Sequence, residues 1–321
     1  MKTIFKALLI VGSITPNLFF SQQSSSTFDQ PIVGSSIVIK FSPIPAGSFT
    51  IGSAEKEKGH EKDESPPTLL RIDSFWMSSY EITYDQFEFF LDEEKDTAPK
   101  PDAITRPSPP YIDFTLGMGK QGGFPANSMT QYSALMYCKW LYHKTGVFFR
   151  LPTEAEWEYA CRAGANTAYP FGKDAKQLMD YGWFSKNSGG KYHKVGELKP
   201  NAWGLYDMLG NVQEWTLDNY HPDYSIIAKS IPFKVGDTPP SVQPSSRTLK
   251  SLKGGSYLDK ETDLRPANRI PSDPIWNRRD PQIPKSKWWN ADAPFVGFRI
   301  IKPVRQPTQG EVEAFFKSYL N

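Results

Sequence analysis

The sequence is poor in the two residue types that most often build disulfide frameworks and transition-metal sites. It has 2 cysteines, Cys138 and Cys161, and 4 histidines among 321 residues. Two cysteines form one bridge at most, so a disulfide framework is excluded, while a single bridge and two buried thiols both stay open. The histidines show no spacing that is typical of a metal site. They are His60, His143, His193 and His221.

The chain also lacks an excess of charge of one sign. Its 37 Lys and Arg nearly balance 35 Asp and Glu, which leaves a net charge of +2. No overall field therefore favours nucleic acid or an acidic membrane surface, and we expect no nucleic-acid partner.

Long apolar runs are missing as well. The run Ala7–Ile14 is much shorter than the roughly 20 residues that a transmembrane helix needs, so we expect no transmembrane segment. Lys2 and Lys6 precede this run and the small residue Ser21 follows it. This order predicts a secretory signal peptide over residues 1–21, the alternative being a buried N-terminal helix. The segment has no cysteine, so we expect an exported periplasmic or extracellular protein that is not a lipoprotein.

Aromatic residues, proline and glycine are plentiful instead. Aromatics make up 14% of the chain, beside 28 Pro and 23 Gly. This composition predicts a folded, loop-rich domain in which aromatic side chains supply much of the packing. Regular elements come early and do not alternate as strand, helix and strand, which predicts the α+β class and a single compact domain.

The pattern of apolar residues places the expected elements. Thr153 and Glu156 have the spacing of a capping box, and Ser128 stands before another helix. We predict a flexible lead-in over 22–36, a domain over 37–303 and a C-terminal extension over 304–321. The expected strands are Ile37–Phe41, Gly47–Gly52 and Leu69–Tyr80, and the expected helices are Thr83–Leu91, Met129–Lys144, Thr153–Arg162 and Gln309–Leu320.

Five motifs in a fixed order resemble the formylglycine-generating enzyme (sulfatase-modifying factor) superfamily over residues 40–302. The resemblance implies a single compact domain related to the C-type lectin fold. The motifs are Ile44–Gly52, Tyr80–Thr83, Phe149–Gly164, Pro200–Trp215, and Lys253–Tyr257 followed by Phe295–Arg299.

The resemblance implies a calcium site in the fourth motif. Calcium takes oxygen ligands from carboxylates and backbone carbonyls. By position these are the side chains of Asp207 and Glu214 and the carbonyls of Gly210 and Val212; Gln213 stands where the family usually has Trp. The alternative is a turn closed by hydrogen bonds alone. In the third motif, Glu154 and Glu156 lie two apart on a helix and do not face each other, which favours a structural role over paired acid and base.

The fifth motif carries the main departure from the family. The resemblance implies two cysteines that bind copper(I) and activate oxygen to oxidise a substrate cysteine, and Asp259 and Leu264 stand at their positions. Soft thiolates suit copper(I) and carboxylates do not, so we expect no copper and no catalytic residue.

A basic and aromatic stretch follows this motif. Arg and Trp dominate binding hot spots, so the stretch indicates a surface for a protein, peptide or glycan. The alternative is that the Trp side chains fill the core and the Arg side chains form internal ion pairs. The candidate ligand-binding residues are Asp259, Arg265, Arg269, Arg278, Arg279, Trp288 and Trp289.

The sequence thus predicts a non-catalytic member that acts as a binding or assembly component in the periplasm or at the cell surface. The resemblance supports this by analogy, since relatives without the cysteines occur in secretion and gliding machinery and as ligand-binding domains. The alternative is an enzyme of the formylglycine-generating or oxygenase type that uses a non-standard site.

Overall fold

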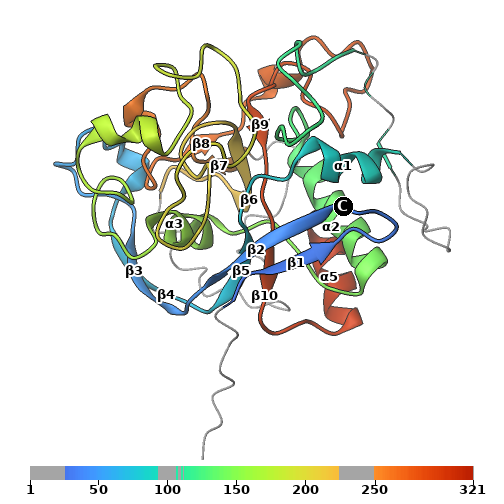
Figure 1. Cartoon of the computed structure of the whole chain (residues 1–321), viewed down its shortest axis with the longest axis horizontal. Coiled ribbons are helices and arrows are strands. Elements are labelled where there is room, and N and C mark those ends of the chain that lie inside the picture. Colours follow the sequence, from blue (N-terminus) through green and yellow to red (C-terminus); the bar gives the residue numbers. More distant parts are fainter. Residues whose placement is uncertain (1–25, 93–105, 108–109, 111, 224–248, 321) are drawn as a thin grey trace, which may run out of the picture.

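The computed structural model describes residues 26–92, 106–107, 110, 112–223 and 249–320 (Figure 1). The predicted signal peptide at 1–21 lies outside these residues. In chain order the elements are β1 (Phe28–Pro31), β2 (Val38–Ile44), β3 (Gly47–Ile51), η1 (Lys62–Glu64), β4 (Thr68–Ile72), β5 (Phe75–Ser78), α1 (Tyr84–Leu91), α2 (Gln131–Thr145), α3 (Glu154–Arg162), η2 (Ala175–Asp180), β6 (Gln213–Asn219), β7 (Lys250–Lys253), η3 (Glu261–Asp263), β8 (Ile270–Pro271), η4 (Pro274–Asn277), β9 (Val296–Gly297), β10 (Ile301–Pro303) and α5 (Gln309–Leu320).

Short strands form three small sheets in the described part of the chain. One sheet has the order β1-β2-β5-β10, β3 and β4 form a two-stranded pair, and the third has the order β8-β7-β6-β9. In the third sheet β6 is antiparallel to β7 and parallel to β9, with Gln213 opposite Val296. The α+β prediction is confirmed. The third sheet brings the fourth and fifth motifs side by side.

The predicted helices are present, and local caps explain most of their bounds. Thr153 accepts a hydrogen bond from the backbone of Glu156, whose side chain returns to Thr153, so the predicted capping box caps α3. Helix α2 begins later than predicted. Its cap is Thr130, which accepts from the backbone of Ser133, whereas Ser128 has a φ of 60° and cannot serve as the cap.

Part of the predicted flexible lead-in over 22–36 is a strand, and its residues 22–25 lie outside the described residues. Residues Phe28–Pro31 form β1 and pair with β2, from Phe28 opposite Phe41 to Pro31 opposite Val38. The ring of Phe28 stacks on Phe41 with centroids 5.0 Å apart, which explains why this segment joins the sheet.

Helix α5, near the C-terminus, was predicted from its apolar spacing. It packs against α2 (Figure 1). Phe315 and Phe316 are buried and meet the ring of Phe148 edge-on at 5.1 and 5.9 Å. The C-terminal extension therefore contributes to the main core rather than trailing from the domain.

The two cysteines occupy helices α2 and α3. Cys138 and Cys161 are both buried and both free. Of the two alternatives left open by the sequence, the structure has the buried thiols. None of the helices in the described residues is both long enough and apolar enough to cross a bilayer.

Candidate functional site

A buried ion pair anchors the fourth motif. Glu214, on β6, accepts hydrogen bonds from Arg299 Nε and Nη2 at 2.6 and 2.7 Å and from Trp157 Nε1 at 2.7 Å. Neither charged side chain is exposed. Such a pair is tolerated in the interior when its remaining hydrogen-bonding atoms are also satisfied, and Arg299 meets this condition by donating to backbone carbonyls as well.

Two further carboxyl groups lie near this pair. Glu81 accepts hydrogen bonds from Asn211 Nδ2 at 2.6 Å and from Val212 N at 3.0 Å. Burial, with the nearby charges of Asp207 and Glu214, raises the pKa of Glu81 well above its usual range. Burial also raises the pKa of Asp207 to about 6. Three interior carboxyl groups therefore surround one guanidinium.

The predicted calcium ligands fit this arrangement in part. One oxygen of Asp207 accepts a backbone N–H at 2.7 Å, and its other oxygen, Oδ1, is buried without a hydrogen-bond partner. Glu214 does not fit as arranged, because Arg299 and Trp157 already occupy both of its oxygens. The described residues hold no group of three or more His, Cys, Asp or Glu side chains placed to bind a metal. The predicted set was Asp207, Gly210, Val212 and Glu214.

Asp259 stands where the resemblance places the first cysteine, and it accepts hydrogen bonds from its own domain. Asp259 Oδ2 accepts from Ser256 N at 2.7 Å, from Ser256 Oγ at 2.8 Å and from Gln213 Nε2 at 3.1 Å. All three donors belong to the same domain and converge on this one oxygen. Asp259 thus closes the turn that follows β7 and ties it to β6.

Leu264 stands where the resemblance places the second cysteine, and its side chain lies in the core. Leu264 is fully buried and packs against the turn that contains Gly255. Gly255 has a φ of 70°, and a Cβ there would meet Leu264 Cδ1 at 2.9 Å. The glycine and the leucine therefore fit each other, and Leu264 offers no group that binds a metal.

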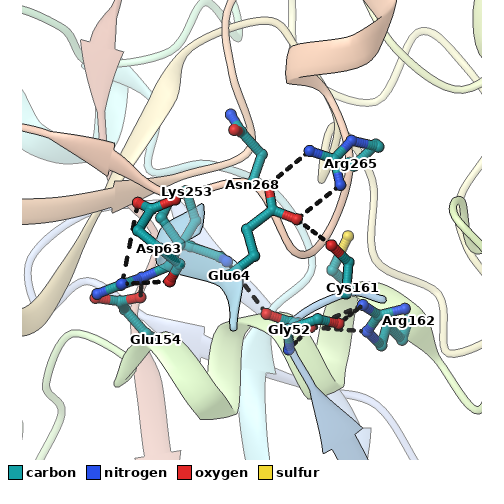
Figure 2. A network of polar contacts seen from close by, with 12 residues as sticks. Gly52, Asp63, Glu64, Glu154, Cys161, Arg162, Lys253, Arg265 and Asn268 are labelled. Carbon is teal, nitrogen blue, oxygen red and sulfur yellow. Dashed lines mark hydrogen bonds and ion pairs between the residues drawn. The ribbon is translucent and has the colours of Figure 1, made fainter. Parts of the chain in front are cut away.

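Two of the predicted ligand-binding arginines, Arg265 and Arg269, lie in the interior. Figure 2 shows Arg265 facing Glu64. Arg265 donates to both oxygens of Glu64, at 2.8 and 2.6 Å, and Arg269 donates to both oxygens of Glu154, at 2.7 and 3.1 Å. Arg265 is 1% exposed and Arg269 is 5% exposed. For these two residues the alternative of internal ion pairs holds, and neither belongs to a binding surface.

Another cluster of buried charged side chains, which the sequence did not predict, lies nearby. Lys253, which opens the fifth motif, is fully buried and donates to Glu158 at 3.2 Å. Arg162 donates to the other oxygen of Glu158 at 2.9 Å and to the carbonyl of Gly52 at 3.0 Å. Figure 2 shows Arg162 and Gly52 facing each other beside the arginine pairs. The cluster joins the third and fifth motifs through charge.

The remaining predicted ligand residues lie near the surface. Arg278 and Arg279 are exposed, and Arg279 pairs with Asp292. Trp288 is half-buried, whereas Trp289 is only 7% exposed and packs on Phe87 and Phe114. The structure thus divides the predicted set between core and surface.

A surface cavity of about 920 Å³ lies beside helix α1 and is lined in part by Trp289. Its wall combines rings with charged and amide groups, and Lys120 Nζ lies 4.4 Å from the ring centroid of Tyr84. The side chain of Asn127 also lines it and is mostly buried. Such a mixture is typical of a pocket for a polar ligand. Its main lining residues are Tyr84, Asp113, Phe114, Lys120, Asn127 and Trp289.

Sequence reasoning missed this cavity because its residues come from separated segments that form no motif. Glu81 was also missed, although it lies within Tyr80–Thr83, a motif quoted for the resemblance. Its place between Tyr80 and Ile82 is the signal that could have singled it out, because an acid among apolar neighbours needs partners in the fold.

The family described as "Sulfatase-modifying factor enzyme 1-like domain" matches residues 39–303. The chain belongs to this family.

Curated relatives and solved structures agree with the assignment. The chain is 30% identical over 276 residues to "Serine/threonine-protein kinase pkn1" of Chlamydia pneumoniae, which covers 83% of this chain and 40% of that protein. It is 27% identical over 262 residues to "Formylglycine-generating enzyme" of Mus musculus, which covers 68% of this chain and 66% of that protein. The chain therefore spans less than two thirds of either relative.

Two solved structures show the same fold. PvdO from Pseudomonas aeruginosa superposes with a TM-score of 0.64 at 23% identity, covering 87% of this chain and 98% of that one. "Treponema denticola variable protein 1" superposes with a TM-score of 0.59 at 21% identity, covering 86% and 99%. At these identities the likeness concerns the fold.

Proposed function

We propose that this chain is a non-catalytic member of the sulfatase-modifying-factor family, exported to the periplasm or cell surface, where it acts as a binding or assembly component. The observation that carries the proposal is the state of the two cysteine positions. One carboxylate oxygen of Asp259 accepts three hydrogen bonds from its own domain, and Leu264 is fully buried in the core.

The chemistry of the remaining thiols supports the same conclusion. Burial raises the pKa of both Cys138 and Cys161, so neither is a thiolate at neutral pH. The thiolate is the form that binds copper(I) and attacks a substrate, so these cysteines do not replace the missing pair. A relative in Bos taurus that is 33% identical over 153 residues carries the name "Inactive C-alpha-formylglycine-generating enzyme 2".

The cavity beside α1 is the site that we propose for a protein, peptide or glycan ligand. It combines the ring of Tyr84, the ammonium of Lys120 and the amide of Asn127. These groups offer a surface for stacking and donors for hydrogen bonds, which together recognise a polar ligand. Trp289 lines the same cavity and is the predicted ligand residue that this proposal retains.

An activity assay tests the non-catalytic part of the proposal. The protein is incubated with copper, oxygen and a peptide that contains Cys-x-Pro-x-Arg. The mass of the peptide is then measured by mass spectrometry. We expect no change in mass, whereas a family enzyme with both cysteines converts the same peptide. Conversion of the cysteine by this chain would overturn the proposal.

A capture assay tests the binding part. The tagged chain is used to isolate partners from an envelope extract, beside the cavity variants Tyr84→Ser and Lys120→Glu. The control is Lys176→Glu, which places the same charge change at an exposed residue outside the cavity. We expect both cavity variants to lose the partner and the control to keep it. Equal capture by all variants would exclude the cavity as the binding site.

A further inference from the structure

The segment 272–287 presents apolar and basic side chains together at the surface. Ile283 is 98% exposed and Ile275 is 54% exposed. The segment contains two acids, of which Asp280 is only 3% exposed. Its four basic residues are all exposed: Arg278, Arg279, Lys285 and Lys287.

Internal hydrogen bonds fix the tip of this segment. The buried carboxylate of Asp280 accepts from Gln282 N at 2.9 Å and from Ser286 N at 2.5 Å. Lys285 Nζ donates to the carbonyls of Arg278, at 3.0 Å, and of Asp280. Because both sides of the tip are tied down, the exposed position of Ile283 between them is set by the fold.

Aromatic residues lie at the base of the segment. The rings of Tyr132 and Trp288 meet edge-on with centroids 5.0 Å apart, and both are half-buried. Lys287 Nζ lies 4.7 Å from the first centroid and 5.3 Å from the second. Trp and Tyr concentrate at the boundary between lipid and water, where one edge of the ring is apolar and the other is wet.

We propose that the segment 272–287, the basic loop, docks on a membrane surface that contains anionic phospholipid. Ile283 enters the boundary between headgroups and acyl chains, and the basic residues contact the phosphates. Arg278 and Lys287 are the principal contacts, since Arg279 is paired with Asp292 and the ammonium of Lys285 holds two carbonyls. The ammonium of Lys287 donates once within the domain, to the Tyr132 hydroxyl at 3.1 Å, and keeps its other donors for phosphate.

The shape of the basic loop favours lipid over a protein partner. Protein interfaces concentrate their energy in aromatic residues that fill pockets at the centre of a broad contact. Here the most exposed apolar side chain, Ile283, is a single residue at a tip, with cations on both sides of it in the sequence. The net charge of the whole chain, +2, does not argue against this, because attraction to a membrane acts within about a Debye length.

Co-sedimentation with vesicles tests the proposal on the full chain. One set of vesicles contains phosphatidylglycerol and phosphatidylcholine in equal parts, and the other contains phosphatidylcholine alone. We expect binding to the anionic set that weakens as salt is added. We expect the partition coefficient to fall about tenfold or more in the Arg278→Ala, Lys287→Ala double variant, and also to fall in Ile283→Ser.

Strand β4 supplies matched controls. Leu69 is 73% exposed and Arg71 is exposed on the same side of the strand, so Leu69→Ser and Arg71→Ala make equivalent changes elsewhere on the surface. Residues 1–21 are identical in all variants and cannot produce a difference between them. Equal loss in the controls and in the loop variants would overturn the proposal. So would unchanged binding by the loop variants, or failure of the native chain to prefer anionic vesicles.

Discussion

Gln213 Nε2 donates a hydrogen bond of 3.1 Å to Asp259 Oδ2 across the boundary between β6 and the turn after β7. The resemblance places a Trp at the first position and a copper-binding Cys at the second, so we infer that both positions depart from the family pattern. The two departures therefore contact each other in the folded chain. A carboxylate that replaces a thiolate needs donors, and a glutamine supplies one where tryptophan would fill the same space.

We predict that these two side chains are energetically coupled. The variants Gln213→Ala and Asp259→Ala and their double variant form a double-mutant cycle, followed by urea unfolding. We expect a coupling free energy of about 0.5–1.5 kcal/mol, the net contribution of one hydrogen bond. Combining Gln213→Ala with Asp263→Ala serves as the control and is expected to be additive. A coupling indistinguishable from that control would contradict the prediction.

A second prediction separates the interior arginines from those at the surface. Arg265→Met leaves Glu64 buried without its guanidinium, which we expect to lower the free energy of unfolding by about 3–5 kcal/mol. Arg278→Met, the same change at an exposed position, is expected to alter it by less than about 0.5 kcal/mol. Chemical unfolding of both variants measures the difference, and equal effects would show that the burial of Arg265 is not decisive.

The burial of one of these arginines and the exposure of the other could not be predicted from the sequence. Arg265 and Arg278 are 13 positions apart in one basic stretch, and neither carries a local signal of burial. The burial of Arg265 depends on Glu64, about 200 residues away along the chain. A pairing of that separation is set by tertiary structure, so the sequence predicted the residue types of the stretch and not their division between core and surface.

Helix bounds show the same division between local and long-range causes. The capping box of Thr153 and Glu156 is local, and it was predicted correctly. Ser128 and Thr130 are both good caps, and tertiary contacts decide between them. Ser128 N donates to the carbonyl of Val296 at 2.9 Å, and the Ser128 carbonyl accepts from Asn290 N at 2.7 Å. These bonds hold Ser128 outside the helix, so the cap falls to Thr130.

A third prediction concerns pH. Burial, with Glu154 nearby, raises the pKa of Asp218 from 3.8 to about 7. Between these values the folded chain holds a proton that the unfolded chain has lost, so the contribution of Asp218 to stability falls as the pH rises from about 4 to about 7.

Asp218→Asn removes this titration and keeps an oxygen that can accept from the backbone N–H of Glu154, now bonded at 2.6 Å. We expect the variant to gain stability relative to the native chain between pH 5 and pH 8, on the order of 1–3 kcal/mol. Urea unfolding at a series of pH values measures the gain. Parallel stability curves for the two proteins would show that Asp218 ionises normally in the folded chain.

The last prediction concerns the calcium that the family resemblance implies. Asp207 Oδ1 is buried without a hydrogen-bond partner, and Glu81 and Glu214 add two carboxyl groups around the single guanidinium of Arg299. A bound dication would offset this excess of buried carboxyl groups. We therefore expect calcium to raise the melting temperature of the native chain and a chelator to lower it, because a ligand that binds only the folded state stabilises it.

Asp207→Ala is expected to remove the response to calcium, since it deletes the side-chain oxygens that would bind the ion. Asp263→Ala makes the same change on η3 and is expected to leave the response intact. Metal analysis after dialysis measures bound calcium directly. If the native chain retains none and its melting temperature is the same with calcium and with chelator, the turn over 207–214 is held by its hydrogen bonds alone, as the bonding of both Glu214 oxygens to Arg299 and Trp157 already allows.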